Sequence, residues 1–218
     1  MIDHSTPAPT PLQGIYGGTF DPVHLGHVGT VTHVLEQTQL PTIRWIPSAI
    51  PPHRPTPGVS AHDRLAMVRL ATADEPRFIV DDRELRRNKP SYTVDTIRSL
   101  NAQYPSQRYA IILGMDALLS LESWHEYEWL LATVHIIVMQ RPGWSAPDSL
   151  PHWWAQRQVD QFAQLGASNA GRIWPIKINP INVSATEIRQ RIQSGQDITG
   201  LAPPRVIDYI RHHKLYER

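Results

Sequence analysis

Short apolar runs alternate with segments of helical spacing along the chain from Gly14 onward. Apolar runs of roughly four to eight residues are typical of buried strands, whereas apolar residues three and four positions apart are typical of amphipathic helices. The predicted strands are Gly14–Gly17, Thr42–Ile46, Arg77–Asp81, Tyr109–Leu113, His135–Met139 and Arg172–Ile178. Such alternation favours an α/β protein whose parallel strands are joined by crossover helices on both faces of the sheet.

Helix-start signals complete the division of the chain. Ser60 and Ser184 each stand three residues before an acid, the spacing of a capping box that opens a helix. Two prolines precede an amphipathic pattern that predicts a last helix over about 203–213. The length of 218 residues suits about one domain. We therefore expect a single domain over 13–218, a Rossmann-like doubly wound parallel sheet, after a flexible N-terminal tail, 1–12.

Composition excludes several classes of protein. The 21 Lys and Arg residues balance 20 Asp and Glu residues, so there is no global field for clamping a nucleic acid backbone. The absence of cysteine excludes disulfides, thiolate metal sites and a cysteine nucleophile. No apolar run has the length of a membrane span, and the first residues lack the pattern of a secretory signal. We expect a cytoplasmic protein without nucleic acid or membrane partners, and a homo-oligomer stays open.

The segment Gly17–His27, GGTFDPVHLGH, lies between the first predicted strand and the first predicted helix. Two glycines after a strand let the backbone approach a ligand, and the N-terminus of the following helix offers free N–H groups to an anion. The segment has neither the Gly-Lys-Ser/Thr of a P-loop nor the Gly-x-Gly-x-x-Gly of a dinucleotide-binding turn. It predicts a different kind of anion site, which contains His24 and His27.

Three interpretations of His24 and His27 are open. A metal site would need further His, Asp or Glu ligands from elsewhere in the chain. Two histidines at a helix start can also cap turns and take no part in chemistry. We favour phosphate handling, because imidazoles at a helix N-terminus can donate hydrogen bonds to phosphate oxygens and stabilise charge on a transferring group. In that interpretation Gly26 leaves room for the contact between imidazole and phosphate.

GGTFDPVHLGH resembles the first signature of the nucleotidyltransferases that share a His-x-Gly-His motif. These enzymes transfer a nucleotidyl group from a nucleoside triphosphate and release pyrophosphate. Their second signature, Ser-(Ser/Thr/Ala)-Thr-x-Ile-Arg, is matched by Ser184–Arg189, SATEIR. Two matches in the expected order are far more specific than either match alone.

The segments between the two signatures are similar to those of nicotinate-nucleotide adenylyltransferases, which make deamido-NAD from nicotinate mononucleotide and ATP. They are PPHR at 51–54, SYTVDT at 91–96, LGMD at 113–116, LESWHEY at 121–127 and RPG at 141–143. The resemblance runs from about Gly14 to Arg191. The chain departs from it at Arg54, where lysine is usual, at Val183, where isoleucine is common, in the proline-rich tail and over 144–171.

The resemblance implies catalytic roles for His24 and His27. The expected ATP-binding residues are Gly17, Gly18, Thr19, Phe20, His24, His27, Ser184, Thr186 and Arg189. The expected residues for nicotinate mononucleotide are His53, Arg54, Tyr92, Thr93, Asp116, Trp124 and Arg141. No residue is expected to bind a metal directly, and Mg2+ is expected to accompany ATP, held by phosphates and water.

The residue types suit this second substrate. Nicotinate mononucleotide carries a flat cationic ring, a carboxylate and a phosphate, which call for an aromatic face and hydrogen-bond donors. Trp124 offers the face, Thr93 a donor and Asp116 oxygens for the ribose hydroxyls. Each type has a structural alternative: Trp124 as a core residue, Thr93 as a helix cap and Arg141 as a surface charge. The run 83–89, RELRRNK, predicts a solvated loop at a strand end rather than an anion site.

Neither a cysteine nor an evident Ser-His-Asp order supports a covalent enzyme intermediate. We therefore expect the mononucleotide phosphate to attack the α-phosphorus of ATP directly and in line. Because that phosphate is already anionic, catalysis reduces to positioning and charge stabilisation. His27 is expected to stabilise the leaving pyrophosphate, while Arg189 and the helix opened by Ser184 hold the β- and γ-phosphates.

Other functions stay open. A pantetheine-phosphate adenylyltransferase typically has threonine at the place of His24 in a shorter chain. A cytidylyltransferase typically approaches the second signature through Arg-Thr-x-Gly-Ile-Ser, where this chain has NPINV at 179–183. A nucleotide-binding module without turnover would share the fold, and the presence of both histidines and Arg189 argues against it.

Overall fold

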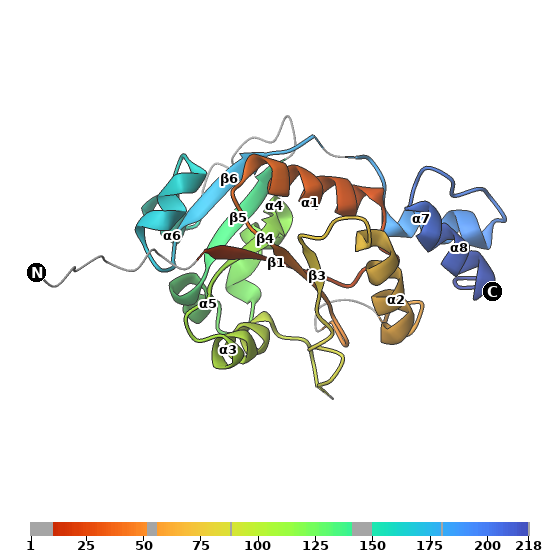
Figure 1. Cartoon of the computed structure of the whole chain (residues 1–218), viewed down its shortest axis with the longest axis horizontal. Helices are drawn as coiled ribbons and strands as arrows, with labels where there is room; N and C mark the ends of the chain where they lie inside the picture. The colour runs from red at the N-terminus through yellow and green to blue at the C-terminus, as the bar shows by residue number, and fades with distance from the viewer. Residues whose placement is uncertain (1–10, 52–55, 88, 141–149, 180, 218) are drawn as a thin grey trace, which may run out of the picture.

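Parallel strands form a single sheet in the computed structural model, which describes residues 11–51, 56–87, 89–140, 150–179 and 181–217. The strands are β1 (Leu12–Gly18), β2 (Ile43–Pro47), β3 (Phe78–Val80), β4 (Arg108–Gly114), β5 (His135–Gln140) and β6 (Ile173–Lys177). Their order is β3-β2-β1-β4-β5-β6, and every neighbouring pair is parallel (Figure 1). The six strand predictions and the Rossmann-like single domain are confirmed.

Helices cover both faces of the sheet. They are α1 (Leu25–Gln37), α2 (Ala61–Thr72), α3 (Thr93–Gln103), α4 (Met115–Leu119), α5 (Tyr127–Thr133), α6 (His152–Arg157), α7 (Ala185–Gln193) and α8 (Pro204–His212), with short 3-10 helices η1 (Leu121–Ser123) and η2 (Phe162–Ala167). Because successive strand residues point to opposite sides, Ala110 and Ile112 of β4 join one hydrophobic core and Ile111 and Leu113 the other. The first core includes α1, α2, α7 and α8, and the second α3, α4, α5 and α6. Figure 1 shows α1 above the sheet and α3 and α5 below it.

The predicted helix starts at Ser60 and Ser184 are confirmed. The Ser60 hydroxyl accepts a hydrogen bond from the backbone N–H of Asp63 at 3.1 Å, and Ser184 accepts one from Glu187 at 3.1 Å. The last helix, α8, begins at Pro204, as the paired prolines predict. Among the helices of the described residues, none combines the length and the apolar character needed to cross a membrane.

The chain joins the sheet earlier than expected. Leu12 is the first residue of β1 and pairs with Arg108 of β4. The predicted tail over 1–12 is therefore wrong at its last residue, while 1–10 lie outside the described residues. Sequence reasoning found no motif over 144–171. The described part of this segment, 150–171, contains α6 and η2, and Trp153 and Trp154 of α6 are buried.

The described part of the run 83–89 is only partly the solvated loop that its charges predict, because Arg86 and Lys89 are exposed whereas Arg83 and Glu84 are not. The Arg83 side chain is only 11% exposed, and its Nε lies 2.8 Å from Oδ2 of Asp81. Glu84 is buried, and its carboxylate accepts a hydrogen bond from the Thr96 hydroxyl of α3. Burial raises the pKa of Glu84. The prediction is wrong for Arg83 and Glu84, because a run of charges does not reveal the partners that cover it.

The strand order places a topological switch point between β1 and β4. From β1 the chain winds outward through β2 to β3, and α3 then carries it back to β4 on the other side of β1. In open α/β sheets, ligands bind outside the carboxyl ends of the strands at such a point. Gly17 and Gly18 end β1, and Gly114 ends β4. The fold therefore places the loop that contains His24 and His27 where a ligand is expected.

Candidate active site

Phe20 shapes the loop that follows β1. Its ring is 2% exposed and lies 5.2 to 5.6 Å, between ring centroids, from Tyr16, Trp45 and His27. A Cβ atom on Gly18 would lie 2.8 Å from the Phe20 ring, so glycine is required there because the ring lies against the backbone. Phe20 was expected to bind ATP, but the structure places its side chain in the core. Only the backbone of Phe20 is then available to a ligand.

His24 and His27 lie side by side at the N-terminus of α1. Their ring centroids are 3.7 Å apart, with an angle of 31° between the planes. His24 is the N-cap residue, and its backbone N–H donates to Nδ1 of His27 at 3.3 Å. Because Nδ1 accepts this bond, neutral His27 carries its proton on Nε2. His27 therefore caps the helix start with one nitrogen and has a donor on the other.

Burial keeps His24 uncharged at neutral pH. The residue is only 7% exposed, and this burial lowers the pKa of the His24 imidazole to about 4. Among the described residues, Nδ1 of His24 has no hydrogen-bond partner. A Cβ atom on Gly26 would lie 2.9 Å from the His24 ring. The missing side chain of Gly26 therefore leaves the space that the His24 ring occupies.

Arg189 brings the second signature to the first. It lies on α7, and its Nη1 donates to the backbone oxygen of Asp21 at 2.6 Å and lies 3.7 Å from Asp21 Oδ2. Its Nη2 donates to the Thr186 hydroxyl at 3.4 Å. The Arg189 side chain is 31% exposed, which leaves part of the guanidinium open to an anion. Ser184, at the N-cap of the same helix, is exposed.

Asp21 was given no role by sequence reasoning, yet it joins several segments of the site. Its Oδ1 accepts a hydrogen bond from the Tyr216 hydroxyl at 3.0 Å, and its Oδ2 accepts one from the backbone N–H of Gly58 at 2.9 Å. Tyr216 is buried, and this burial raises its pKa. Together with Arg189, these contacts fix the loop that leads to His24. The place of Asp21 inside the first signature was a usable signal, whereas nothing in the sequence pattern indicates Tyr216.

The residues expected for nicotinate mononucleotide lie at the start of α3 and after β4. Tyr92 is the N-cap residue of α3 and Thr93 is its first residue, so Thr93 is not the cap. The Tyr92 ring lies 4.9 Å from the ring of His125, which sequence reasoning did not single out. Trp124, the preceding residue, is half-buried and packs at the margin of the second core. Asp116 is exposed in the first turn of α4.

The remaining residues expected to bind a ligand differ in their surroundings. Gly17 is exposed at the end of β1. The carbonyl of Thr19 accepts a hydrogen bond from Arg64 at 2.6 Å. Three expected residues lie outside the described residues: His53, Arg54 and Arg141. Within the described ranges, no group of three or more His, Asp or Glu side chains could hold a metal ion, so the metal interpretation of the histidine pair finds no further ligands there.

Comparisons with known proteins agree with this geometry. The pattern of the family described as cytidylyltransferase-like matches residues 15–191. A probable nicotinate-nucleotide adenylyltransferase of Aeromonas salmonicida (strain A449) is 43% identical over 206 residues, which cover 94% of this chain and 96% of the relative. A probable nicotinate-nucleotide adenylyltransferase of Pseudomonas entomophila (strain L48) is 47% identical over 207 residues, 93% of this chain and 94% of the relative.

Solved structures share the fold. A Plasmodium falciparum nicotinic acid mononucleotide adenylyltransferase complexed with NaAD superposes with a TM-score of 0.72 at 19% identity, covering 94% of this chain and 97% of that chain. A putative nicotinate-nucleotide adenylyltransferase from Vibrio parahaemolyticus superposes with a TM-score of 0.64 at 14% identity. With the family pattern and the curated relatives, the chain belongs to the cytidylyltransferase-like family and, within it, to the nicotinate-nucleotide adenylyltransferases.

Proposed function

We propose that this protein transfers the adenylyl group of ATP to nicotinate mononucleotide, giving nicotinate adenine dinucleotide and pyrophosphate in NAD biosynthesis. The contact between the two signatures carries the proposal, because Arg189 donates to Asp21 in the loop that leads to His24 and His27. This loop follows β1 at the switch point of the sheet, where α/β proteins bind ligands. The 43% identity to the Aeromonas salmonicida relative supports the choice of second substrate.

The reaction is a direct displacement at phosphorus. An oxygen of the mononucleotide phosphate forms a bond to the α-phosphorus of ATP, and the bond from that phosphorus to the bridging oxygen breaks. Pyrophosphate leaves with the electron pair of the broken bond. The attacking phosphate is already anionic, so no enzyme group has to remove a proton. The enzyme's contribution is to align the two phosphates and to stabilise the charge that develops on the leaving side.

The residues of the two signatures suit these tasks. Nδ1 of His27 accepts the His24 N–H, so in the neutral imidazole Nε2 would carry the N–H that donates to the leaving pyrophosphate. His24, held neutral by burial, would donate or accept a single hydrogen bond to the triphosphate. The N-terminus of α7 at Ser184, with Thr186 and Arg189, would hold the β- and γ-phosphates.

We infer that Mg2+ enters with ATP. The described residues offer no cluster of three side chains that could hold a metal ion, so phosphate oxygens and water would supply the coordination. A cytoplasmic location belongs to the same proposal, and the lack of cysteine is compatible with it.

A pyrophosphate-release assay tests the proposed function. The full chain is incubated with ATP and Mg2+ and, in separate reactions, with nicotinate mononucleotide, nicotinamide mononucleotide and phosphopantetheine. We expect pyrophosphate and nicotinate adenine dinucleotide in the first reaction. Absence of pyrophosphate in that reaction would overturn the proposal, and release with phosphopantetheine instead would favour the pantetheine-phosphate alternative. Binding of ATP without turnover in any reaction would favour the binding module.

We expect Trp124→Leu to raise the KM for nicotinate mononucleotide by about tenfold, the effect of losing an aromatic face for a cationic ring. The KM for ATP should stay near the wild-type value, because Trp124 lies at the margin of the second core and directly precedes His125, whose ring contacts Tyr92. Trp129→Leu is the matched control, since Trp129 is also half-buried. Its ring stacks with Arg98 of α3 instead, and the guanidinium carbon lies 4.8 Å from the ring centroid. Equal KM increases in both variants would contradict the assignment.

Tyr216→Phe should raise the KM for ATP by about fivefold, the equivalent of one hydrogen bond worth about 1 kcal/mol. The variant loses the bond to Asp21 that helps to fix the loop beside Arg189. Tyr209→Phe serves as control, because the Tyr209 hydroxyl donates to Asp63 at 3.0 Å, between α8 and α2. Initial rates at varied ATP measure both variants, and an unchanged KM in Tyr216→Phe would contradict this role.

A further inference from the structure

Arg64 of α2 is a buried cation whose partners are backbone carbonyls. The residue is 1% exposed. Its Nη1 donates to the carbonyl of Thr19 at 2.6 Å and to that of Ser48 at 2.7 Å, and its Nη2 donates to that of Ala49 at 3.1 Å. Burial lowers the pKa of Arg64, and the nearby charge of Asp21 opposes this shift. A buried charge is costly, so a guanidinium kept here must supply something that an apolar side chain cannot.

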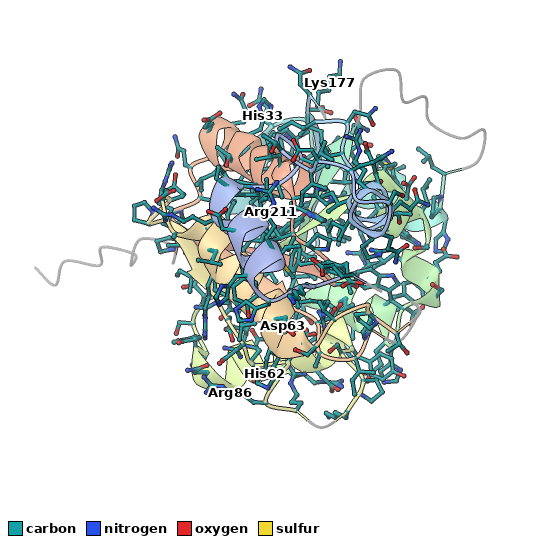
Figure 2. The ribbon with its side chains drawn as sticks, turned by 90° about the vertical axis from the view of Figure 1, so that its right-hand side faces the viewer. His33, His62, Asp63, Arg86, Lys177 and Arg211 are labelled. Carbon is teal, nitrogen blue, oxygen red and sulfur yellow. The ribbon has the colours of Figure 1, made fainter. Side chains whose placement is uncertain are left out.

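The carbonyls that Arg64 holds belong to two different loops. Thr19 lies in the loop after β1 that leads to His24, and this loop is on the ATP side of the proposed site. Ser48 and Ala49 follow β2. Figure 2 labels Asp63, the residue before Arg64, on α2 next to α8. One side chain on α2 therefore joins two loops that extend from neighbouring strands.

The loop after β2 is in turn joined to the mononucleotide side. The backbone N–H of Ala49 donates to the Ser91 hydroxyl at 3.0 Å, and the backbone N–H of Ser91 donates to the carbonyl of Ile50 at 2.9 Å. Ser91 directly precedes Tyr92 and Thr93, the residues expected to contact nicotinate mononucleotide. A continuous series of hydrogen bonds thus runs from the ATP-side loop through Arg64 to the start of α3.

We propose that Arg64 is a positioning residue that sets the separation between the ATP-binding loop and the mononucleotide-binding segment. This inference rests on the proposed function. In-line transfer requires the attacking oxygen and the α-phosphorus to approach within about 3 to 3.5 Å, and a small error in placement lowers the rate strongly. The planar fork of arginine holds carbonyls at fixed relative positions, whereas the single ammonium of lysine cannot reproduce that geometry.

Arg64→Lys tests the inference because it keeps the charge and most of the volume. We expect kcat to fall by about 30-fold or more, while the Kd of a non-hydrolysable ATP analogue alone and the Kd of nicotinate mononucleotide alone each change by less than about threefold. The dinucleotide product spans both sites, so its Kd should rise by about tenfold, more than the two separate changes predict. A purely structural role would not produce this difference between separate and joined ligands.

Arg108→Lys is the matched control. Arg108 is the first residue of β4, at the amino end of the strand and away from the carboxyl ends where the site is proposed. Its Nη2 donates to the carbonyls of Leu165 at 2.7 Å and Ser168 at 2.6 Å. Like Arg64, it has a buried Nε without a hydrogen-bond partner among the described residues. We expect the Arg108 variant to lose stability in urea denaturation but to keep the wild-type kcat and product Kd.

Two groups of results would overturn the inference. In the first, the Arg64→Lys enzyme keeps kcat and the product Kd near wild type. In the second, it loses affinity for each single substrate as strongly as for the product. Either result shows that Arg64 does not set the separation between the two segments. The same holds if Arg108→Lys lowers kcat equally. If Arg64→Lys does not fold cooperatively, Arg64→Gln, which keeps one planar donor group, is measured in its place with the same expectations. A wild-type protein that releases no pyrophosphate with nicotinate mononucleotide would overturn the proposed function and this inference together.

Discussion

Replacing His27 with asparagine should lower kcat by about 100-fold, the cost of removing one hydrogen-bond donor from a transition state. The amide oxygen of asparagine can take the place of Nδ1 and accept the backbone N–H of His24, so the helix start stays capped. No donor then remains at the place of Nε2. We expect the free energy of unfolding to change by less than about 1 kcal/mol, the usual value of a cap. Pyrophosphate release at saturating substrates and urea denaturation measure the two quantities.

The glutamine variant separates the two nitrogens of His27. Its amide nitrogen can reach the place of Nε2, so His27→Gln should keep more activity than the asparagine variant but lose the cap. His33→Gln, farther along α1 (Figure 2), is a control that should leave kcat unchanged. An asparagine variant with nearly wild-type kcat, or one that unfolds, would show that His27 has only a structural role.

Acidification should destabilise the fold through its buried histidines. Burial lowers the pKa of His24 to about 4, and burial together with the charge of Arg108 lowers the pKa of His135 to about 4. In the unfolded chain these histidines take up protons near the ordinary histidine pKa of 6.5, whereas in the folded chain they stay neutral down to about pH 4. The full free energy of unfolding is therefore present above pH 6.5, and it falls as the pH decreases toward 4. Each histidine accounts for a loss of about 3 kcal/mol over this range.

His135 gives the sharper test because it is fully buried and lies at the amino end of β5, away from the loop that follows β1. Its Nδ1 accepts the backbone N–H of Arg172, a bond that an asparagine side chain can also accept. We expect His135→Asn to be less stable at pH 7 but to lose about half of the histidine-dependent fall in stability between pH 6.5 and pH 4. The raised pKa of Glu84 acts in the opposite direction in both proteins and cancels in the comparison. Identical pH dependence in variant and wild type would refute the role of His135.

Much of the fold could be predicted from local patterns. The strands are short apolar runs, and both faces of the central strand β4 are buried, since its alternate residues serve two separate cores. The hydroxyls of Ser60 and Ser184 cap helices as predicted, because a capping contact involves residues only three positions apart. Leu12 was missed because pairing with Arg108 depends on a strand far along the chain.

The site was predictable as two motifs but not as an arrangement. The spacing of His24 and His27 indicates an anion site, yet it does not reveal that the His24 ring fills the space beside Gly26. The motif does not predict that the Phe20 side chain is buried, because its burial depends on Tyr16 and Trp45, whose positions only the folded sheet fixes. The roles of Arg64 and Tyr216 depend on contacts across the fold, and no local pattern indicates them.

The hydrogen bonds of Asp21 also determine when the site can form during folding. The partners of Asp21 lie 37, 168 and 195 residues away along the chain, at Gly58, Arg189 and Tyr216. Contacts of such large sequence separation form slowly, because long loops must close before the contacts can stabilise them. A chain still being synthesised can therefore build β1, β2 and their helices while the loop after β1 lacks its anchors at Arg189 and Tyr216. Activity should appear only after the segment through Tyr216 has left the ribosome and packed.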